Sequence, residues 1–170
     1  MTVCVQGREC LLGEIVDGEM ELNEAGRMVE TWWRELSNKF PSVEIDTFVV
    51  MPNHFHGIVV INNPVGADLR VCPNNNVHVG ADLRVGLSNA GAHPGAPLHG
   101  IVQWFKTMTT NAYIRGVKQT NWPPFPGRLW QRNYYERIVR DEAELDAIRK
   151  YIDENPLKWL EDDENPANVP

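Results

Sequence analysis

The sequence predicts an α+β protein in which helices pack on one face of an antiparallel sheet. Two patterns support this prediction. Short runs rich in β-branched residues predict strands, whereas longer stretches with an apolar residue at every third or fourth position predict helices. These segments follow one another in the order strand, helix, strand, strand, helix, strand, helix. The length suits one compact domain, which we expect to span residues 1–170.

The N-terminal part begins with a predicted strand at residues 2–6. Two short apolar pieces then flank Asp17-Gly18, a dipeptide that is typical of tight hairpin turns. Asn23 is a suitable N-cap for the segment that follows, in which apolar residues recur at helical spacing. We expect this helix to end near Asn38.

The middle of the chain predicts a hairpin. Residues 43–50 and 54–61 are rich in β-branched residues, and Pro52-Asn53 interrupts the pattern between them. After a long gap, residues 98–115 predict a second amphipathic helix.

The last elements are a strand and a helix. Residues 134–139 predict the fourth strand. Asp141 followed by Glu144 resembles a capping box, which would open the last helix, and Pro156 would stop it. The complete order favours a ferredoxin-like α+β sandwich, an antiparallel sheet with helices packed on it.

The composition bears on location and partners. No apolar run reaches membrane-spanning length, no secretory signal is apparent, and the three cysteines form no CxxC pair, so we expect a reduced, cytoplasmic protein without a membrane partner. The net charge of −7 argues against non-specific coating of duplex DNA. It leaves room for a nucleic-acid enzyme, because a local basic groove and a bound cation can act within an acidic protein.

An exact repeat interrupts the predicted fold. The heptapeptide VGADLRV occurs at residues 65–71 and again at 79–85, within a segment, residues 62–97, that is rich in Asn, Gly, Pro and Ala. Two repeats are too few for a solenoid, so we interpret the segment as a duplication inside a tolerant loop. The alternative is a DNA-contacting arm that uses Arg70 and Arg84.

Two histidines are the first candidate site. His54 and His56 stand two apart on a predicted strand, so both point to one face while Phe55 points to the other. Two adjacent imidazoles can share a divalent metal ion. The alternative is a pair of histidines with no ligand.

The second candidate is on the last helix. Tyr151 and Asn155 are four residues apart and therefore project from the same side. The Asn155 amide oxygen would serve as a third metal ligand, with the Tyr151 hydroxyl close to any phosphate held there. A tyrosine at the edge of the core and an asparagine at a helix end are the alternative interpretation.

Together these motifs resemble the small single-tyrosine transposases of bacterial insertion sequences, in particular the REP-associated tyrosine transposases. The segment MPNHFHG at residues 51–57, which would close the central hairpin, is similar to the signature of that family. Further similar segments are REC (8–10), GEMELN (18–23), LWQRNYYERI (129–138), RDE (140–142) and YIDENP (151–156). The resemblance covers nearly the whole chain except residues 62–97.

The resemblance implies a metal-dependent transposase that nicks and rejoins single-stranded or hairpin DNA through a 5′-phosphotyrosine. It implies that His54, His56 and Asn155 hold a divalent metal, Mg²⁺ or Mn²⁺, and that Tyr151 is the nucleophile. We expect such a protein to act as a monomer or a homodimer.

Other residues are weaker candidates. Basic residues that would contact DNA phosphates are Lys106, Arg115 and Lys150. Three tryptophans would stack on unpaired bases or pack in the core, namely Trp104, Trp122 and Trp130. The rival nucleophiles are Tyr113, Tyr134 and Tyr135, none of which stands one helical turn from a candidate ligand.

Two other functions fit the same residues. The first is a module that keeps the fold and binds DNA hairpins without cutting them. The second is a metal-dependent phosphoesterase in which water replaces Tyr151 as the nucleophile.

Overall fold

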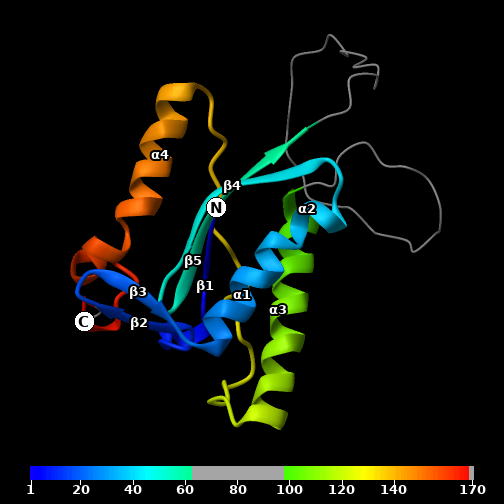
Figure 1. Cartoon of the computed structure of the whole chain (residues 1–170), viewed down its shortest axis with the longest axis vertical. Coiled ribbons are helices and arrows are strands. Elements are labelled where there is room, and N and C mark those ends of the chain that lie inside the picture. Colours follow the sequence, from blue (N-terminus) through cyan, green and yellow to red (C-terminus); the bar gives the residue numbers. More distant parts are fainter. Residues whose placement is uncertain (63–97, 169–170) are drawn as a thin grey trace, which may run out of the picture.

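A three-stranded antiparallel sheet lies at the centre of the computed structural model, which describes residues 1–62 and 98–168 (Figure 1). Its strands, in the spatial order β1–β5–β4, are β1 (Thr2–Cys4), β5 (His54–Ile61) and β4 (Val43–Val50). A separate antiparallel hairpin consists of β2 (Gly13–Val16) and β3 (Glu19–Leu22). The predicted α+β class with an antiparallel sheet is confirmed.

The helices lie on both sides of this sheet. The α-helices are α1 (Glu24–Arg34), α2 (Leu36–Lys39), α3 (Leu98–Thr120) and α4 (Glu142–Glu154). Short 3₁₀ helices are η1 (Gln6–Arg8), η2 (Pro156–Glu161) and η3 (Pro166–Asn168). Figure 1 shows α1 and α3 side by side on one side of the sheet and α4 on the other.

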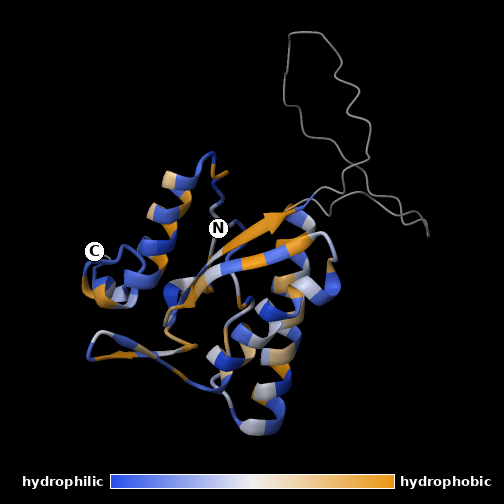
Figure 2. Cartoon of the chain, turned by 45° about the horizontal axis from the view of Figure 1, so that its top comes forward, coloured by the Kyte–Doolittle hydropathy of each residue, from blue (hydrophilic) through white to orange (hydrophobic). Residues whose placement is uncertain are grey.

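The core lies between the sheet and the α1–α3 layer. The Phe55 ring packs 4.5 Å from that of Trp33 and 5.4 Å from that of Phe105, measured between ring centroids, and all three side chains are fully buried. Gly57 leaves room for them, because a Cβ there would lie 2.5 Å from the Trp33 ring. Figure 2 shows hydrophobic residues along β5 and, alternating with hydrophilic ones, along the helices.

Two architectural predictions are wrong. Helix α4 does not share a face with α1 and α3, because it packs against β4 on the side away from Phe55. Residues 134–139 do not form a strand, since only Tyr135 makes an isolated bridge, to Thr2. The neighbouring strand β1 is only three residues long, so it offers too little backbone for a continuous fourth strand.

Several local predictions are confirmed. Asp17 and Gly18 both adopt positive φ angles, of 52° and 82°, as the hairpin turn requires. The Asn23 side chain caps α1 by accepting a hydrogen bond from the Gly26 amide. Asp141 caps α4 in the same way, whereas the Glu144 carboxylate accepts from the Arg140 amide, one residue before the position of an ordinary capping box.

The repeats at residues 65–71 and 79–85, with Arg70 and Arg84, lie outside the described residues. Within the described part of the chain, none of the helices combines the length and apolar character needed to cross a membrane.

Candidate active site

The two histidines of β5 face away from the core. Strand alternation places Phe55 toward α1 and α3 and therefore turns His54 and His56 to the α4 side of the sheet. β5 is the central strand, with β1 and β4 on either side, so its backbone is held on both edges. Both imidazoles are consequently fixed and buried, at 0% and 7% exposure.

The two imidazoles meet at their Nε2 atoms, which lie 3.0 Å apart. Burial lowers the pKa of His54 to about 4, outweighing the attraction of the Asp162 carboxylate. Burial, reinforced by the neighbouring His54, lowers the pKa of His56 to about 3. Both rings are therefore neutral near pH 7, which is the form that binds metal ions.

Asn53 sets the tautomer of His54. The Asn53 amide group donates to the carbonyls of Arg8, at 3.0 Å, and Glu164, at 2.7 Å, which identifies its nitrogen. Its oxygen then accepts from His54 Nδ1, 2.9 Å away. Because Nδ1 carries the proton, His54 Nε2 presents a lone pair to the site.

The hydrogen bond with Thr2 is compatible with either neutral tautomer of His56. It stands opposite His56 in the β1–β5 register, and its hydroxyl lies 2.8 Å from His56 Nδ1. When the hydroxyl donates, His56 Nε2–H donates to His54 Nε2. When the hydroxyl accepts, both Nε2 lone pairs point into the site, as a shared cation requires.

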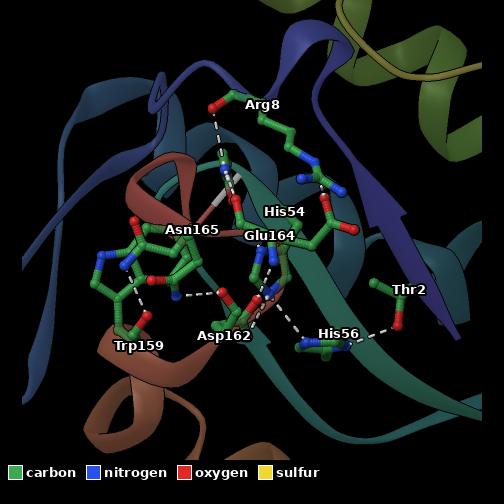
Figure 3. Close-up of polar contacts among 10 residues, drawn as sticks. Thr2, Arg8, His54, His56, Trp159, Asp162, Glu164 and Asn165 are labelled. Carbon is green, nitrogen blue, oxygen red and sulfur yellow. Dashed lines mark hydrogen bonds and ion pairs between the residues drawn. The ribbon is translucent and has the colours of Figure 1, made fainter. Parts of the chain in front are cut away.

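A carboxylate that the sequence did not single out completes this group. Asp162, just after η2, places Oδ2 3.9 Å from His54 Nε2, and the ligand atoms of His54, His56 and Asp162 all lie within 4.8 Å of one another (Figure 3). Its carboxylate belongs to an acidic run at residues 161–164, which sequence alone presents as a solvated surface.

Contacts with the sheet hold this C-terminal segment in place. The Glu164 carbonyl accepts from Asn53, and its carboxylate pairs with Arg8 at 3.0 Å. Trp159 places its ring 6.1 Å from that of His54, and its carbonyl accepts from the Asn165 side chain (Figure 3). The segment thus closes over His54, which brings Asp162 to the histidines.

Helix α4 delivers Tyr151 and Asn155 to the same place. The Tyr151 ring lies 5.4 Å from that of His56, and Tyr151 and the C-cap residue Asn155 line a pocket of about 590 Å³ together with His56 and Asp162. Asn155 keeps helical angles (φ −59°, ψ −42°) although Pro156 follows, so Tyr151 and Asn155 remain one turn apart.

The buried Asn155 amide offers a further oxygen ligand to this group. The side chain is 2% exposed, and no described residue hydrogen-bonds to Oδ1. A buried carbonyl oxygen without a partner is costly. Two imidazole nitrogens, a carboxylate and an amide oxygen form a donor set that suits a divalent cation such as Mn²⁺ or Mg²⁺. The described residues therefore include a group that fits a divalent metal.

The environment of Tyr151 disfavours its phenolate. Tyr151 as a whole is 48% exposed. Partial burial of its hydroxyl and the nearby Asp162 carboxylate raise the pKa of that hydroxyl. The hydroxyl is therefore protonated near neutral pH. A bound cation would oppose this effect, because it would offset the negative charge of Asp162.

A comparison with known proteins places the chain in a family. A Haemophilus influenzae protein, described as an uncharacterized protein, is 36% identical over 163 residues, which are 95% of this chain and 81% of the relative. The chain belongs to the same family as this Haemophilus influenzae protein. No model of a known protein family matches the chain.

Lys106, one of the three expected phosphate contacts, is occupied within the fold of this family member. Its ammonium donates to the carbonyls of Gln131, Arg132 and Asn133 at 2.9 to 3.3 Å and lies over the Tyr134 ring. It thereby ties α3 to the segment that follows. This arrangement favours a structural role over direct contact with DNA.

The other two expected phosphate contacts lie on different surfaces. Arg115 is exposed on α3. Lys150 precedes the tyrosine on α4, has a side chain that is 73% exposed, and pairs with Glu154 at 3.6 Å. Such exposed pairs contribute little to stability, so Lys150 is available to another anion.

The tryptophans pack in the fold. Trp104 contacts Trp32 and Phe40, Trp130 contacts Phe105, and Trp122 contacts Tyr113, with ring centroids 5.2 to 6.2 Å apart. These contacts favour core packing over base stacking as their role.

The rival tyrosines differ in position. Tyr113 is fully buried, donates to the Pro123 carbonyl, and is not among the residues that line the Tyr151 pocket. Tyr134 and Tyr135 line the same pocket as Tyr151. Cys4 also lines it, but burial and the nearby Glu164 raise the pKa of its thiol to about 12, which keeps it protonated.

Proposed function

We propose that the protein is a divalent-metal-dependent, single-tyrosine DNA transposase that nicks and rejoins single-stranded or hairpin DNA. The observation that carries this proposal is the position of Tyr151, whose ring lies 5.4 Å from the His56 ring and lines one pocket with Asn155 and Asp162. A nucleophile beside a metal-ligand group is the arrangement that phosphoryl transfer requires.

The metal would be Mg²⁺ or Mn²⁺, held by His54, His56 and an oxygen from Asp162 or Asn155. It would polarise the scissile phosphodiester and offset the charge of the transition state. Asn53 and Thr2 orient the two imidazoles toward it, as second-layer hydrogen bonds do at metal sites.

Tyr151 would supply the covalent step. Its hydroxyl oxygen attacks the phosphorus of a phosphodiester, forms a 5′-phosphotyrosine, and displaces the 3′ oxygen. The phenol proton ends on this released 3′ oxygen, so the step consumes no other reagent. Attack by a second 3′ hydroxyl on the phosphotyrosine reverses the step and joins a new DNA end without ATP.

The pocket offers support for an unpaired substrate. Tyr134 and Tyr135 line it next to Tyr151, and Tyr135 is 66% exposed. Exposed aromatic rings are stacking surfaces for unpaired bases. A single strand or a hairpin flank can present both a base and its phosphate to such a pocket, whereas paired bases are stacked within the duplex.

The test is the formation of a covalent adduct. Purified protein is mixed with a labelled hairpin oligonucleotide that carries single-stranded flanks, in the presence of Mn²⁺, and analysed by denaturing gel electrophoresis. We expect an adduct from the wild type and from Tyr135→Phe, which is the matched control, and none from Tyr151→Phe.

The other outcomes identify the alternatives. Binding without any adduct would show a DNA-hairpin-binding module. Cleavage that persists in Tyr151→Phe but is lost in His54→Ala would show a phosphoesterase that uses water. Either result overturns the tyrosine mechanism.

A further inference from the structure

One continuous part of this acidic chain carries basic residues and no acidic ones. Residues 98–135 contain no Asp or Glu, although the whole chain has 23 of them and a net charge of −7. The same stretch contains five basic residues: Lys106, Arg115, Lys118, Arg128 and Arg132. Local positive charge within a negative protein marks a surface for a polyanion.

This stretch folds back on itself and forms a groove. Helix α3 and the segment 127–132 line a pocket of about 400 Å³ that contains Arg128 and Arg132. None of its lining residues is acidic, whereas the Tyr151 pocket includes a run of four acidic residues. Both arginines are exposed, and no carboxylate among the described residues pairs with either.

The helical wall of the groove is a polar stripe. The α3 residues that line it share one face and are Gln103, Lys106, Thr107, Thr110 and Asn111. Arg115 follows Asn111 by one helical turn and extends the same stripe. Hydroxyl, amide and guanidinium groups in such a row are the donors that phosphate oxygens accept from.

The groove adjoins the Tyr151 pocket. Gln131 lines both pockets, so the two share this residue in their walls. Lys106 holds the backbone around Gln131 in place, because its ammonium donates to the carbonyls of Gln131, Arg132 and Asn133. A strand that leaves the tyrosine and passes Gln131 therefore enters the groove.

We propose that the groove between α3 and residues 127–132 binds the backbone of a single-stranded polynucleotide that extends from the Tyr151 pocket. Arg128 and Arg132 contact its phosphates, and Arg115 lies further along the same path. This inference rests on the proposed function for the identity of the polyanion. In this arrangement the basic groove binds the DNA that flanks the cleavage site, whereas the acidic Tyr151 pocket binds the metal and the scissile phosphate.

The experiment measures binding separately from cutting. The full chain with Tyr151→Phe, in EDTA, is titrated into a fluorescein-labelled single-stranded DNA oligonucleotide of mixed sequence at several salt concentrations, and anisotropy is recorded. Arg128→Ala/Arg132→Ala is compared with Arg27→Ala/Lys39→Ala, a control that removes the same charge from the exposed surface of α1 and α2.

We expect the Arg128→Ala/Arg132→Ala variant to bind about tenfold more weakly. Its plot of log affinity against log salt should be less steep by about 1.4, since each phosphate contact to a single strand contributes about 0.7. Arg128→Lys/Arg132→Lys should keep the original slope, because it keeps both charges. The control variant should match the parent in affinity and slope.

Equal affinity and slope in all these variants would overturn the groove assignment. So would binding of poly-glutamate in place of DNA, which would make the partner an acidic polypeptide. Failure of the tyrosine mechanism gives a different result, namely no covalent adduct from the wild type while the two arginines still control binding.

Discussion

His54 and His56 place their Nε2 atoms 3.0 Å apart, with His54 Nδ1 committed to Asn53. Two neutral imidazoles at this distance need either a proton or a cation between their lone pairs. The Thr2 hydroxyl can donate to or accept from His56 Nδ1, so the protein can meet either need without moving a strand.

The first prediction concerns metal binding by this pair. At a Mn²⁺ concentration 100 times its Kd, the wild type should gain about 2.7 kcal/mol in free energy of unfolding. His54→Ala should gain nothing, because it removes a ligand. Thermal unfolding with and without Mn²⁺ measures this. His99→Ala, which changes an exposed histidine on α3, should respond like the wild type; an equal gain in His54→Ala would refute the site.

The second prediction concerns the carboxylate from the C-terminal segment. Asp162→Asn preserves the size of the side chain but removes its charge, so Mn²⁺ affinity should fall by about tenfold. Isothermal titration calorimetry provides the measurement. Asp163→Asn is the matched control, since Asp163 is the exposed neighbour in the same acidic run. Equal affinities in the two variants would mean that Asp162 does not bind the metal.

The third prediction concerns Asn53 as a positioning residue. Its fully buried side chain makes three hydrogen bonds, to His54, Arg8 and Glu164. Asn53→Ala should lower the free energy of unfolding by about 3 kcal/mol, at roughly 1 kcal/mol for each bond. It should also weaken Mn²⁺ binding by about 10- to 100-fold, because His54 loses its orienting partner.

Urea denaturation and Mn²⁺ titration test both effects of Asn53→Ala. Asn38→Ala is the control, because the Asn38 side chain makes an exposed hydrogen bond to Glu35. An Asn53→Ala protein that is less stable but binds Mn²⁺ like the wild type would limit Asn53 to a structural role.

The fourth prediction concerns pH and the anchoring of α4. Hydrogen bonds from Arg149 lower the pKa of Asp46 from 3.8 to about 2 in the folded protein. The pair therefore stabilises the fold fully above pH 3.8, and its contribution disappears as the pH falls toward about 2. Asp46→Asn should be less stable than the wild type at pH 7, by an amount that shrinks with acidification.

Urea unfolding of Asp46→Asn across the acid range measures this dependence. Asp153→Asn, an exposed substitution on α4, serves as the control and should follow the wild type at every pH. A stability difference that stays constant down to the lowest pH would exclude the ionised Asp46–Arg149 pair as its source.

Local chemistry explains what the sequence predicted. The hairpin at Asp17-Gly18, the Asn23 cap and the opening of α4 at Asp141 each depend on residues within a few positions of one another. The pairing of β4 with β5 also follows from neighbouring segments. Strand alternation and the helical repeat then determined which side chains share a face, including His54 with His56.

Long-range packing explains what the sequence did not predict. Asp162 comes to His54 because Asn53 and Arg8 hold Glu164, contacts that join segments more than 100 positions apart. The side of the sheet that α4 occupies depends in the same way on the pairing of Arg149 with Asp46. Neither arrangement leaves a periodic signal in the segment that carries it.

The direction of β5 places the two histidines at one end of the strand and the connection to the following segment at the other. His54 opens the strand and Ile61 closes it, so the two ends lie about 23 Å apart at 3.3 Å per residue. Residues added after Ile61 therefore join the chain on the side remote from the imidazoles. Doubling the length of such a connection costs only about 0.6 kcal/mol in closure entropy. The length of the chain after Ile61 can consequently vary without displacing His54 and His56.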